Sequence, residues 1–282
     1  MKVLIFGRGF VGTKMQAALE DSVLDPADIA DVAQVRRAME EHTPDAVLNC
    51  AGKTGTPNID WCETNQFVTY RSNTLGPLVL AEECAARKIH LVHLGTGCVF
   101  YGASPDPQGW LEEDFANPSG VYYRSKYAAD LLLAKLPDVA IVRLRMPIDS
   151  EPSPKNLIDK LSHYSKVLEA ENSVTVIDDL ITATKAILAQ RATGIFHAVN
   201  PGVMRNRRLI ELYTELVDPT HANEWITNEQ ILAQGLVKSA RPNCLLQDTR
   251  LPAIGIHLRP IEEALRDCME KYAAAVRTAH KI

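Results

Sequence analysis

The chain has 282 residues, of which 46% are hydrophobic and 23% charged, and this length is enough to bury a sizeable core. A net charge of −5 without any basic block argues against nucleic acid as a partner. The longest apolar runs are only strand-sized, so we expect no membrane association. Six scattered cysteines without a C-x-x-C pair argue against a metal site or a disulfide framework and favour a reducing, cytoplasmic location.

The first predicted element is a buried strand over Lys2–Phe6, followed at once by a glycine-rich turn and a helical pattern. The turn has the form G-x-G-x-x-G. Between a strand and a helix, this pattern predicts a dinucleotide site at the helix N-terminus. A glycine turn without a ligand is the alternative. The residues of the turn that we expect to contact the cofactor are Gly7, Arg8, Gly9, Phe10, Val11 and Gly12.

A second strand is expected around Ser22–Leu24, and an acidic residue for the cofactor ribose should follow it. Asp25, Asp28 and Asp31 are all near, and none is clearly placed. Asp31 also suits the N-cap of the next helix. Arg8 could bind a 2′-phosphate or could face solvent, so the sequence favours NADP(H) and allows NAD(H). The cofactor residues expected in this segment are Asp28 and Ile29.

A third strand is expected over Ala46–Asn49, and small residues follow it that let the backbone pass close beside a cofactor. A long helix should run over about Gln66–Arg87, with Asn73 in its middle. Asn73 could satisfy backbone groups of the active site or be an ordinary buried amide. The expected cofactor contacts in this part of the chain are Cys50, Ala51, Gly52 and Asn73.

The fourth strand, expected over Ile89–Leu94, delivers Thr96 and Cys98 at its carboxyl end, where ligands bind in open α/β sheets. Segment 101–119 is rich in Pro, Gly and Asp and is expected to be a loop. The helix after it carries Tyr122 and Lys126 four residues apart, so both side chains lie on one face.

These side chains suit the reduction of a ketone. Thr96 can hydrogen-bond the carbonyl oxygen and Tyr122 can protonate it, while a nicotinamide cofactor supplies the hydride. We expect the ammonium of Lys126 and a nicotinamide cation both to lower the phenol pKa, and we expect Lys126 to bind the nicotinamide ribose, so Tyr122 and Lys126 also count as cofactor residues. A Tyr–Lys pair on a helix surface is the alternative.

The later part of the chain is less strictly patterned, and Pro152 and Pro154 mark a junction. Its expected elements include a strand over Val139–Arg143, a helix over Asn156–Ser165, a helix capped by Asp178 and Asp179, a strand over Gly194–Val199, and a final helix opened by Pro260. The expected fold is α/β, with a Rossmann-type doubly wound parallel sheet in residues 1–150. A smaller C-terminal substrate-binding lobe takes 151–282, of which about 171–203 returns to the main domain.

Six longer segments resemble a known family more specifically than the glycine turn does. They are Gly55–Glu63, Gly95–Phe100, Arg143–Ile148, Pro154–Lys160, Asn200–Val203 and Ala240–Asn243. Through them the chain resembles the dTDP-4-dehydrorhamnose reductase group of the extended short-chain dehydrogenase/reductases. The closer likeness is to its bifunctional 3,5-epimerase/4-reductases. The resemblance implies that Thr96, Tyr122 and Lys126 form a reductase triad for a nucleotide-linked 4-keto-6-deoxyhexose in rhamnose synthesis.

The resemblance further implies that Cys98 and Lys160 exchange protons at C3 and C5 of this sugar. The alternative without a catalytic role is that Cys98 is a small buried thiol and Lys160 a solvated helix lysine. Arg241 would bind the diphosphate of the substrate, or alternatively it is a charged residue on a surface loop. The residues expected to contact the nucleotide sugar are Thr96, Cys98, Asn156 and Arg241. A homodimer is allowed.

Two other functions remain open on the sequence. A nucleotide-sugar 4-epimerase or 4,6-dehydratase is one, but a dehydratase of this superfamily usually carries an Asp–Glu pair where this chain has Gly97 and Cys98. A non-catalytic dinucleotide-binding regulatory subunit is the other. Such a subunit would typically have lost Tyr122 or Lys126, and both are present.

Overall fold

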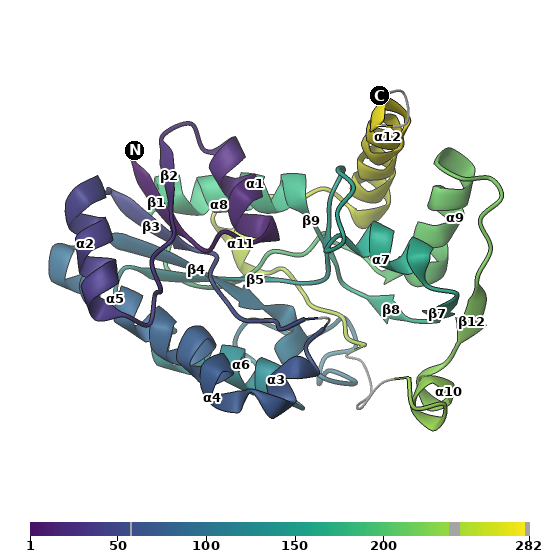
Figure 1. The fold of residues 1–282 in the computed structure, drawn as a ribbon, viewed down its shortest axis with the longest axis horizontal. Coiled ribbons are helices and arrows are strands. Elements are labelled where there is room, and N and C mark those ends of the chain that lie inside the picture. Colours follow the sequence, from purple (N-terminus) through teal and green to yellow (C-terminus); the bar gives the residue numbers. More distant parts are fainter. Residues whose placement is uncertain (57, 237–242, 280–282) are drawn as a thin grey trace.

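A six-stranded parallel sheet forms the centre of the protein, in a computed structural model that describes residues 1–56, 58–236 and 243–279 (Figure 1). The strand order is β10-β5-β4-β3-β1-β2, and every pairing in this sheet is parallel. The strands are β1 (Val3–Phe6), β2 (Ser22–Asp25), β3 (Ala46–Asn49), β4 (His90–Thr96), β5 (Val139–Leu144) and β10 (Gly194–His197). This confirms the Rossmann-type α/β fold and the weakly marked second strand.

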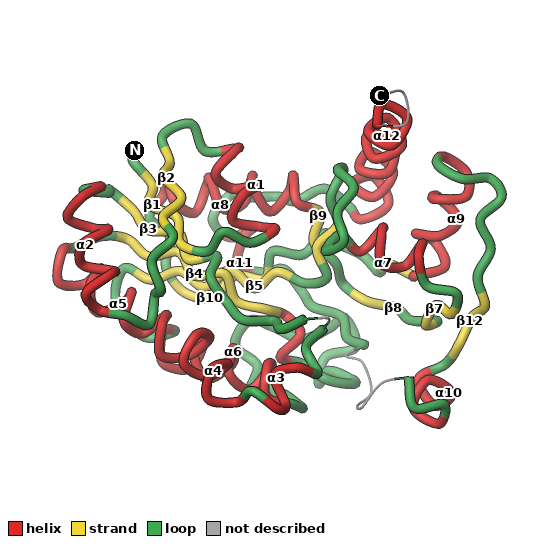
Figure 2. The backbone as a smooth tube through the Cα atoms, in the orientation of Figure 1, coloured by secondary structure: helices red, strands yellow, loops and turns green. Residues whose placement is uncertain are grey.

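Helices cover both faces of the sheet, as Figure 2 shows in red around the yellow strands. Because successive side chains of a strand point to opposite faces, Val3 and Ile5 join one apolar cluster and Leu4 and Phe6 the other. The first cluster is covered by α1 (Phe10–Ala18), α8 (Ile177–Gln190) and α11 (Arg250–Ala253). The second is covered by α2 (Val32–His42), α5 (Gly76–Arg87) and α6 (Val121–Leu133). Asp31 caps α2 as expected, by accepting from the backbone of Ala33 and Gln34.

The helix expected over about 66–87 is divided into three parts. It consists of α4 (Gln66–Tyr70), a π-helical turn η1 (Arg71–Leu75) and α5, and the short α3 (Trp61–Thr64) precedes it. A π-helical turn holds one extra residue and is frequent at functional sites. Here the turn contains the buried Asn73, so the interruption lies where the chain places a polar side chain inside the protein.

The C-terminal part builds a separate apolar cluster beside the sheet. The helices of this part are α7 (Leu157–His163), α9 (Asn206–Leu216), α10 (Asn228–Ala233) and α12 (Ile261–Ala279), of which α7, α9 and α12 contribute to the cluster. Short strands join it in pairs: β6 (Pro147–Ile148) with β9 (Thr175–Val176), β7 (Lys166–Leu168) with β12 (Glu224–Ile226), and β8 (Glu171–Asn172) with β11 (Met204–Arg205). Between these elements the chain goes back to the sheet, because α8 packs on the first cluster and β10 pairs with β5.

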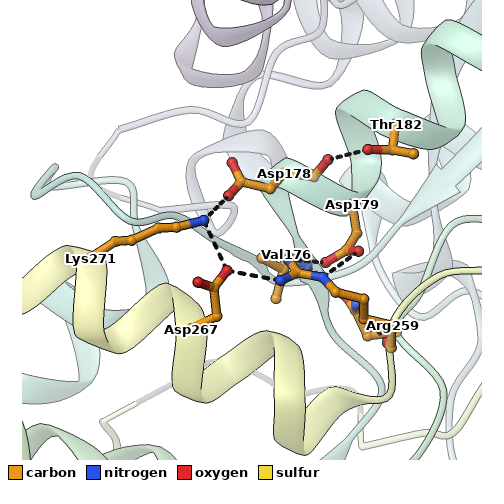
Figure 3. Close-up of polar contacts among 8 residues, drawn as sticks. Val176, Asp178, Asp179, Thr182, Arg259, Asp267 and Lys271 are labelled. Carbon is orange, nitrogen blue, oxygen red and sulfur yellow. Dashed lines mark hydrogen bonds and ion pairs between the residues drawn. The ribbon is translucent and has the colours of Figure 1, made fainter.

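An ion network ties α12 to the start of α8 (Figure 3). Arg259 donates two hydrogen bonds to Asp179, at 3.0 and 2.9 Å, and a third to Asp267 at 2.8 Å. Lys271 bridges Asp178 and Asp267 at 3.0 and 2.9 Å. Asp178 and Asp179 lie in the first turn of α8, where their negative charges suit the helix dipole. They do not cap the helix, which is what the sequence predicted. The N-cap residue is Val176.

We expect Arg259→Met to lower the free energy of unfolding by about 1–3 kcal/mol, because it leaves the carboxylate of Asp179, only 7% exposed, without its bidentate partner. Urea unfolding would measure the change. Arg208→Met is the matched control: Arg208 on α9 pairs with the exposed Glu262 on α12, so its replacement should cost less than about 0.5 kcal/mol. Equal losses in the two variants would contradict this assignment.

No helix in the part of the chain that the structure describes is long and apolar enough to cross a membrane.

Candidate active site

The glycine turn is tightly packed at two positions and open at the third. Gly7 has φ +102°, and a Cβ there would lie 2.4 Å from the backbone nitrogen of Ala51. A Cβ on Gly12 would lie 1.9 Å from the carbonyl oxygen of Gly7, so both positions require glycine. A Cβ on Gly9 would meet nothing within 4 Å. Since Gly9 is the N-cap of α1 and the first turn of α1 has no acidic residue, this open end of the helix fits a pyrophosphate.

The structure decides which acidic residue ends β2. Asp25 is the last residue of that strand and pairs in register with Phe6. Its carboxylate accepts a hydrogen bond from Ala27 at 2.8 Å and lies 3.1 Å from Nε2 of His42. Asp25 is therefore held against α2. Arg8 is exposed within the glycine turn, where it remains available to a phosphate.

The two other residues expected in this segment behave differently from each other. Asp28 is exposed, and its carboxylate accepts from the backbone of Ala30 at 3.0 Å. Ile29 is buried in the core, and a Cβ built on Gly76 would come within 2.5 Å of its side chain. The side chain of Ile29 therefore packs under α5, and only the backbone of this residue can face a cofactor.

The segment after β3 passes beside the glycine turn, as its small residues predict. Burial raises the pKa of the Cys50 thiol to about 12, so this thiol is an inert packing group. Asn73 accepts from the backbone nitrogen of Lys53 at 2.6 Å and donates to the carbonyl of Lys53 at 3.0 Å and to the hydroxyl of Ser125 at 3.0 Å. Of the two interpretations of Asn73, the structure shows the one in which the amide satisfies backbone. It joins the loop after Gly52 to α6.

Thr96, Cys98 and Tyr122 lie together at the carboxyl end of β4. Thr96 is buried, and its hydroxyl accepts from the backbone nitrogen of Cys98 at 3.2 Å. Burial raises the pKa of Tyr122 above its usual value and the neighbouring Cys98 adds to this, whereas a hydrogen bond with Thr96 acts in the opposite direction. The phenol is therefore fully protonated at neutral pH, which is the state of a proton donor.

Lys126 is buried one turn further along α6 and points to the sheet. Its Nζ donates to the carbonyl oxygen of Leu94 at 2.8 Å and lies 3.2 Å from Nε2 of His93. Burial lowers the pKa of Lys126 to about 8, although the charge of Asp130 opposes the shift. The ammonium of Lys126 does not lower the pKa of Tyr122 in the protein alone, because burial of the phenol dominates.

Two residues that the sequence analysis missed sit behind Lys126. Oδ1 of Asn49 accepts from the backbone of Ala51 at 2.9 Å, so Nδ2 of Asn49 faces Nδ1 of His93, also at 2.9 Å. Nδ1 of His93 is then the acceptor, and Nε2 carries the proton toward Lys126. A hydrogen bond from this Nε2–H to Lys126 needs the amine in its neutral form, which burial favours by lowering the pKa of Lys126 to about 8. The available signal was a pair of histidines, His90 and His93, in an otherwise apolar strand.

A third missed residue, Glu63, belongs to the tryptophan-containing segment that carries the family resemblance. Its carboxylate accepts from the backbone nitrogen of Val121 at 2.8 Å, across 58 positions of sequence. Val121 is the first residue of α6, whose own N-cap makes no side-chain hydrogen bond. Glu63 therefore caps the helix that carries Tyr122 and Lys126.

We expect Glu63→Ala to cost about 1 kcal/mol of stability and to speed amide hydrogen exchange at Val121, because the first turn of α6 loses its acceptor. Hydrogen-exchange mass spectrometry and urea unfolding would measure both effects. Glu63→Gln keeps an oxygen in place and should behave like the native chain. Unchanged exchange in Glu63→Ala would show that the contact does not support the helix.

Three of the expected site residues come from the C-terminal lobe: Asn156, Lys160 and Arg241. Lys160 is exposed on α7, where partial desolvation and the charge of Lys155 lower its pKa. Within the described residues no hydrogen bond or ion pair links Lys160 to Cys98. Arg241 lies outside the described residues.

The structure does not support the expectation that Asn156 binds substrate. This residue is fully buried as the N-cap of α7. Its Oδ1 accepts from the backbone nitrogens of Ile158 and Asp149, and its Nδ2 donates to the carbonyls of Asp149 and Glu151. The amide has no donor or acceptor left for a sugar nucleotide.

The parallel sheet, the glycine turn and the Thr–Tyr–Lys grouping define a protein of the short-chain dehydrogenase/reductase class. Within it, this chain belongs to the family described as the RmlD substrate binding domain, whose model matches residues 1–274.

Relatives of known name support the same placement. The bifunctional dTDP-4-dehydrorhamnose 3,5-epimerase/dTDP-4-dehydrorhamnose reductase of Arabidopsis thaliana is 32% identical over 273 residues, which are 93% of this chain and 90% of the relative. The crystal structure of the L780 UDP-rhamnose synthase from Acanthamoeba polyphaga mimivirus has a TM-score of 0.90 and 32% identity, and the match covers 96% of this chain and 99% of that one. A Bacillus anthracis dTDP-4-dehydrorhamnose reductase in complex with NADP shares the fold, with a TM-score of 0.82, 22% identity and coverage of 96% and 99%.

Proposed function

We propose that this protein uses NADPH to reduce the C4 ketone of a nucleotide-linked 4-keto-6-deoxyhexose, and that the same site exchanges protons at C3 and C5. The observation that carries the proposal is the grouping of Thr96, Cys98 and Tyr122 at the carboxyl end of β4, next to the loop held by Asn73. The relatives named for rhamnose synthesis supply the substrate class.

The reduction follows from these side chains. NADPH, when bound at the open end of α1, supplies a hydride to C4. The hydroxyl of Thr96 donates a hydrogen bond to the ketone oxygen, and the phenol of Tyr122 donates the proton that this oxygen needs as C4 is reduced. The raised pKa of Tyr122 supports this role, because it keeps the proton on the phenol until negative charge develops on the substrate. Lys126 would hold the nicotinamide ribose, and the exposed Arg8 favours a cofactor that carries a 2′-phosphate.

The proton exchange uses the same ketone. The thiolate of Cys98 takes a proton from the carbon beside C4, so a C–H bond breaks, an S–H bond forms, and the electron pair moves onto the ketone oxygen as an enolate. The ammonium of Lys160 then returns a proton to that carbon from the opposite face, which inverts the centre. The lowered pKa of Lys160 eases this transfer at neutral pH.

The apolar side chains exposed on neighbouring helices support a homodimer. Phe67 is 92% exposed, and Leu75 on η1 and Leu131 on α6 are also exposed, on elements that pack against each other. Sedimentation equilibrium would test this part of the proposal by measuring the mass of the protein in solution.

The purified protein should oxidise NADPH when it is given dTDP- or UDP-4-keto-6-deoxyglucose, and mass spectrometry should detect the reduced sugar nucleotide. Absorbance at the reduced-nicotinamide band follows the reaction. A parallel assay with NADH tests the cofactor preference. No oxidation with either sugar nucleotide and either cofactor would overturn the proposed function.

A further inference from the structure

Arg145 is a fully buried arginine that the proposed reaction has not yet used. It directly follows β5, in the Arg-Met-Pro segment of the family resemblance. Its backbone is fixed by Thr175, since the nitrogen of Arg145 donates to the Thr175 hydroxyl at 2.9 Å and its carbonyl accepts from the Thr175 nitrogen at 2.8 Å. Burying a guanidinium is costly unless its donors find partners, so the position of this side chain calls for a function.

The guanidinium of Arg145 spans from the active site to the C-terminal lobe. Its Nη1 donates to Sγ of Cys98 at 3.2 Å, and its Nη2 donates to Oδ1 of Asn172 on β8. The same Oδ1 accepts from the backbone nitrogen of Cys244 at 3.3 Å. Asn172 is buried and held from two sides, so it fixes the rigid fork of Arg145 and thereby the direction of the group that faces Cys98.

A permanently charged donor at this distance stabilises the thiolate over the thiol, because the anion accepts a charge-assisted hydrogen bond that the neutral group cannot match. The other cysteines provide a contrast. Burial raises the pKa of Cys50 and Cys84 to about 12, and that of Cys244 to about 11. Cys98 differs from all three in accepting directly from a guanidinium, and unlike Cys84 and Cys244 it is only half-buried.

We propose that Arg145, oriented by Asn172, is a positioning residue that keeps Cys98 in its thiolate form and aims the sulfur at the carbon beside the substrate ketone. This inference rests on the proposed proton exchange. It adds that the thiolate is prepared by the protein before a sugar nucleotide binds. The guanidinium touches the sulfur and acts through it, so Arg145 is not itself the acid or the base.

Alkylation of Cys98 by iodoacetamide tests the inference without any substrate. In Arg145→Met the rate at about pH 7 should fall about tenfold, since a smaller fraction of Cys98 is thiolate, and the rate should recover at about pH 10 where either protein is ionised. Peptide mapping by mass spectrometry identifies the alkylated residue. An equal rate at about pH 7, or a loss that persists at about pH 10, would overturn the proposal, because the second result indicates changed access alone.

Asn172→Ala gives the same test if Arg145→Met does not fold. It keeps the guanidinium but removes the group that orients it, so the rate at about pH 7 should fall severalfold and again recover at about pH 10. Arg259→Met is the matched control, because its partners Asp179 and Asp267 lie on α8 and α12 and its loss should not alter the alkylation of Cys98. A fall in the control equal to that in Arg145→Met would also count against the proposal.

The outcomes separate this inference from the proposed function. If the alkylation profile shifts but the native protein takes up no deuterium beside the ketone, then Arg145 prepares the thiolate and the proposed proton exchange fails. If the native protein exchanges deuterium and Arg145→Met alkylates normally, then the inference fails while the proposed function stands. When both hold, Arg145→Met should lose more of its deuterium uptake than of its reduction of a 4-keto sugar that already has the product configuration at C3 and C5.

Discussion

Replacing Tyr122 with phenylalanine is expected to lower kcat for NADPH oxidation by about 10³-fold, while the affinity for NADPH changes little. Phenylalanine keeps the ring that fills the site but cannot donate a proton to the C4 oxygen. The remaining rate reflects protonation by water and the hydrogen bond from Thr96. Steady-state kinetics with a 4-keto-6-deoxyglucose nucleotide would measure kcat, and fluorescence titration would measure NADPH binding.

Tyr123→Phe is the matched control for this prediction. Tyr123 is the next residue of α6, and its ring packs edge-to-face on that of Tyr122 with a centroid separation of 5.3 Å. It is only 8% exposed and has Tyr127 rather than a lysine four residues on, so kcat should stay within about threefold of the native value. A Tyr122→Phe protein that keeps more than about a tenth of the native kcat would exclude the phenol as the proton donor.

Replacing Cys98 with alanine is expected to separate the two proposed reactions. Deuterium uptake at C3 and C5 in heavy water should fall by at least about 10²-fold, because the thiolate that removes these protons is gone. Reduction of a 4-keto sugar that already has the product configuration should continue within about threefold, since Thr96 and Tyr122 are unchanged. Mass spectrometry and proton NMR of the product would measure the isotope at each carbon.

Cys84→Ala controls for the loss of a thiol as such, because Cys84 is buried in α5 within the second apolar cluster. It should leave both reactions intact. If Cys98→Ala took up deuterium at the native rate, the proposed role of this cysteine would be wrong and only the reductase would remain.

The order of elements and the centre of the site could be predicted from the sequence. Strands β1, β3, β4 and β5 are largely apolar, since a parallel strand is buried on both faces, and a glycine or polar residue is the last residue of each strand or directly follows it. The glycine turn after β1 and the four-residue spacing of Tyr122 and Lys126 are local patterns. A local pattern depends only on residues that are close together in the sequence. The structure therefore has the turn and the helix where the sequence predicted them.

The electrostatic state of the site could not be predicted in the same way. The spacing of Tyr122 and Lys126 predicts that both lie on one helical face, but it does not predict how deeply the two side chains are buried. Depth decides the pKa of each group, and here it raises that of the phenol and lowers that of the ammonium to about 8. The sequence also did not predict the hydrogen bonds of Asn156, whose side-chain amide bonds to backbone groups around the start of α7.

By itself the sequence determined the Rossmann-type architecture, the place of the dinucleotide turn, and the presence of Thr96, Cys98 and Tyr122 at one edge of the sheet. Only the tertiary structure decided that Glu63 caps α6 from 58 positions away and that Arg145 reaches Cys98 from 47 positions away. The physical reason is that these contacts join segments carried on different elements. Whether two such segments come into contact depends on the order of the strands and the packing of the helices. The spacing of residues along the chain does not determine either of these.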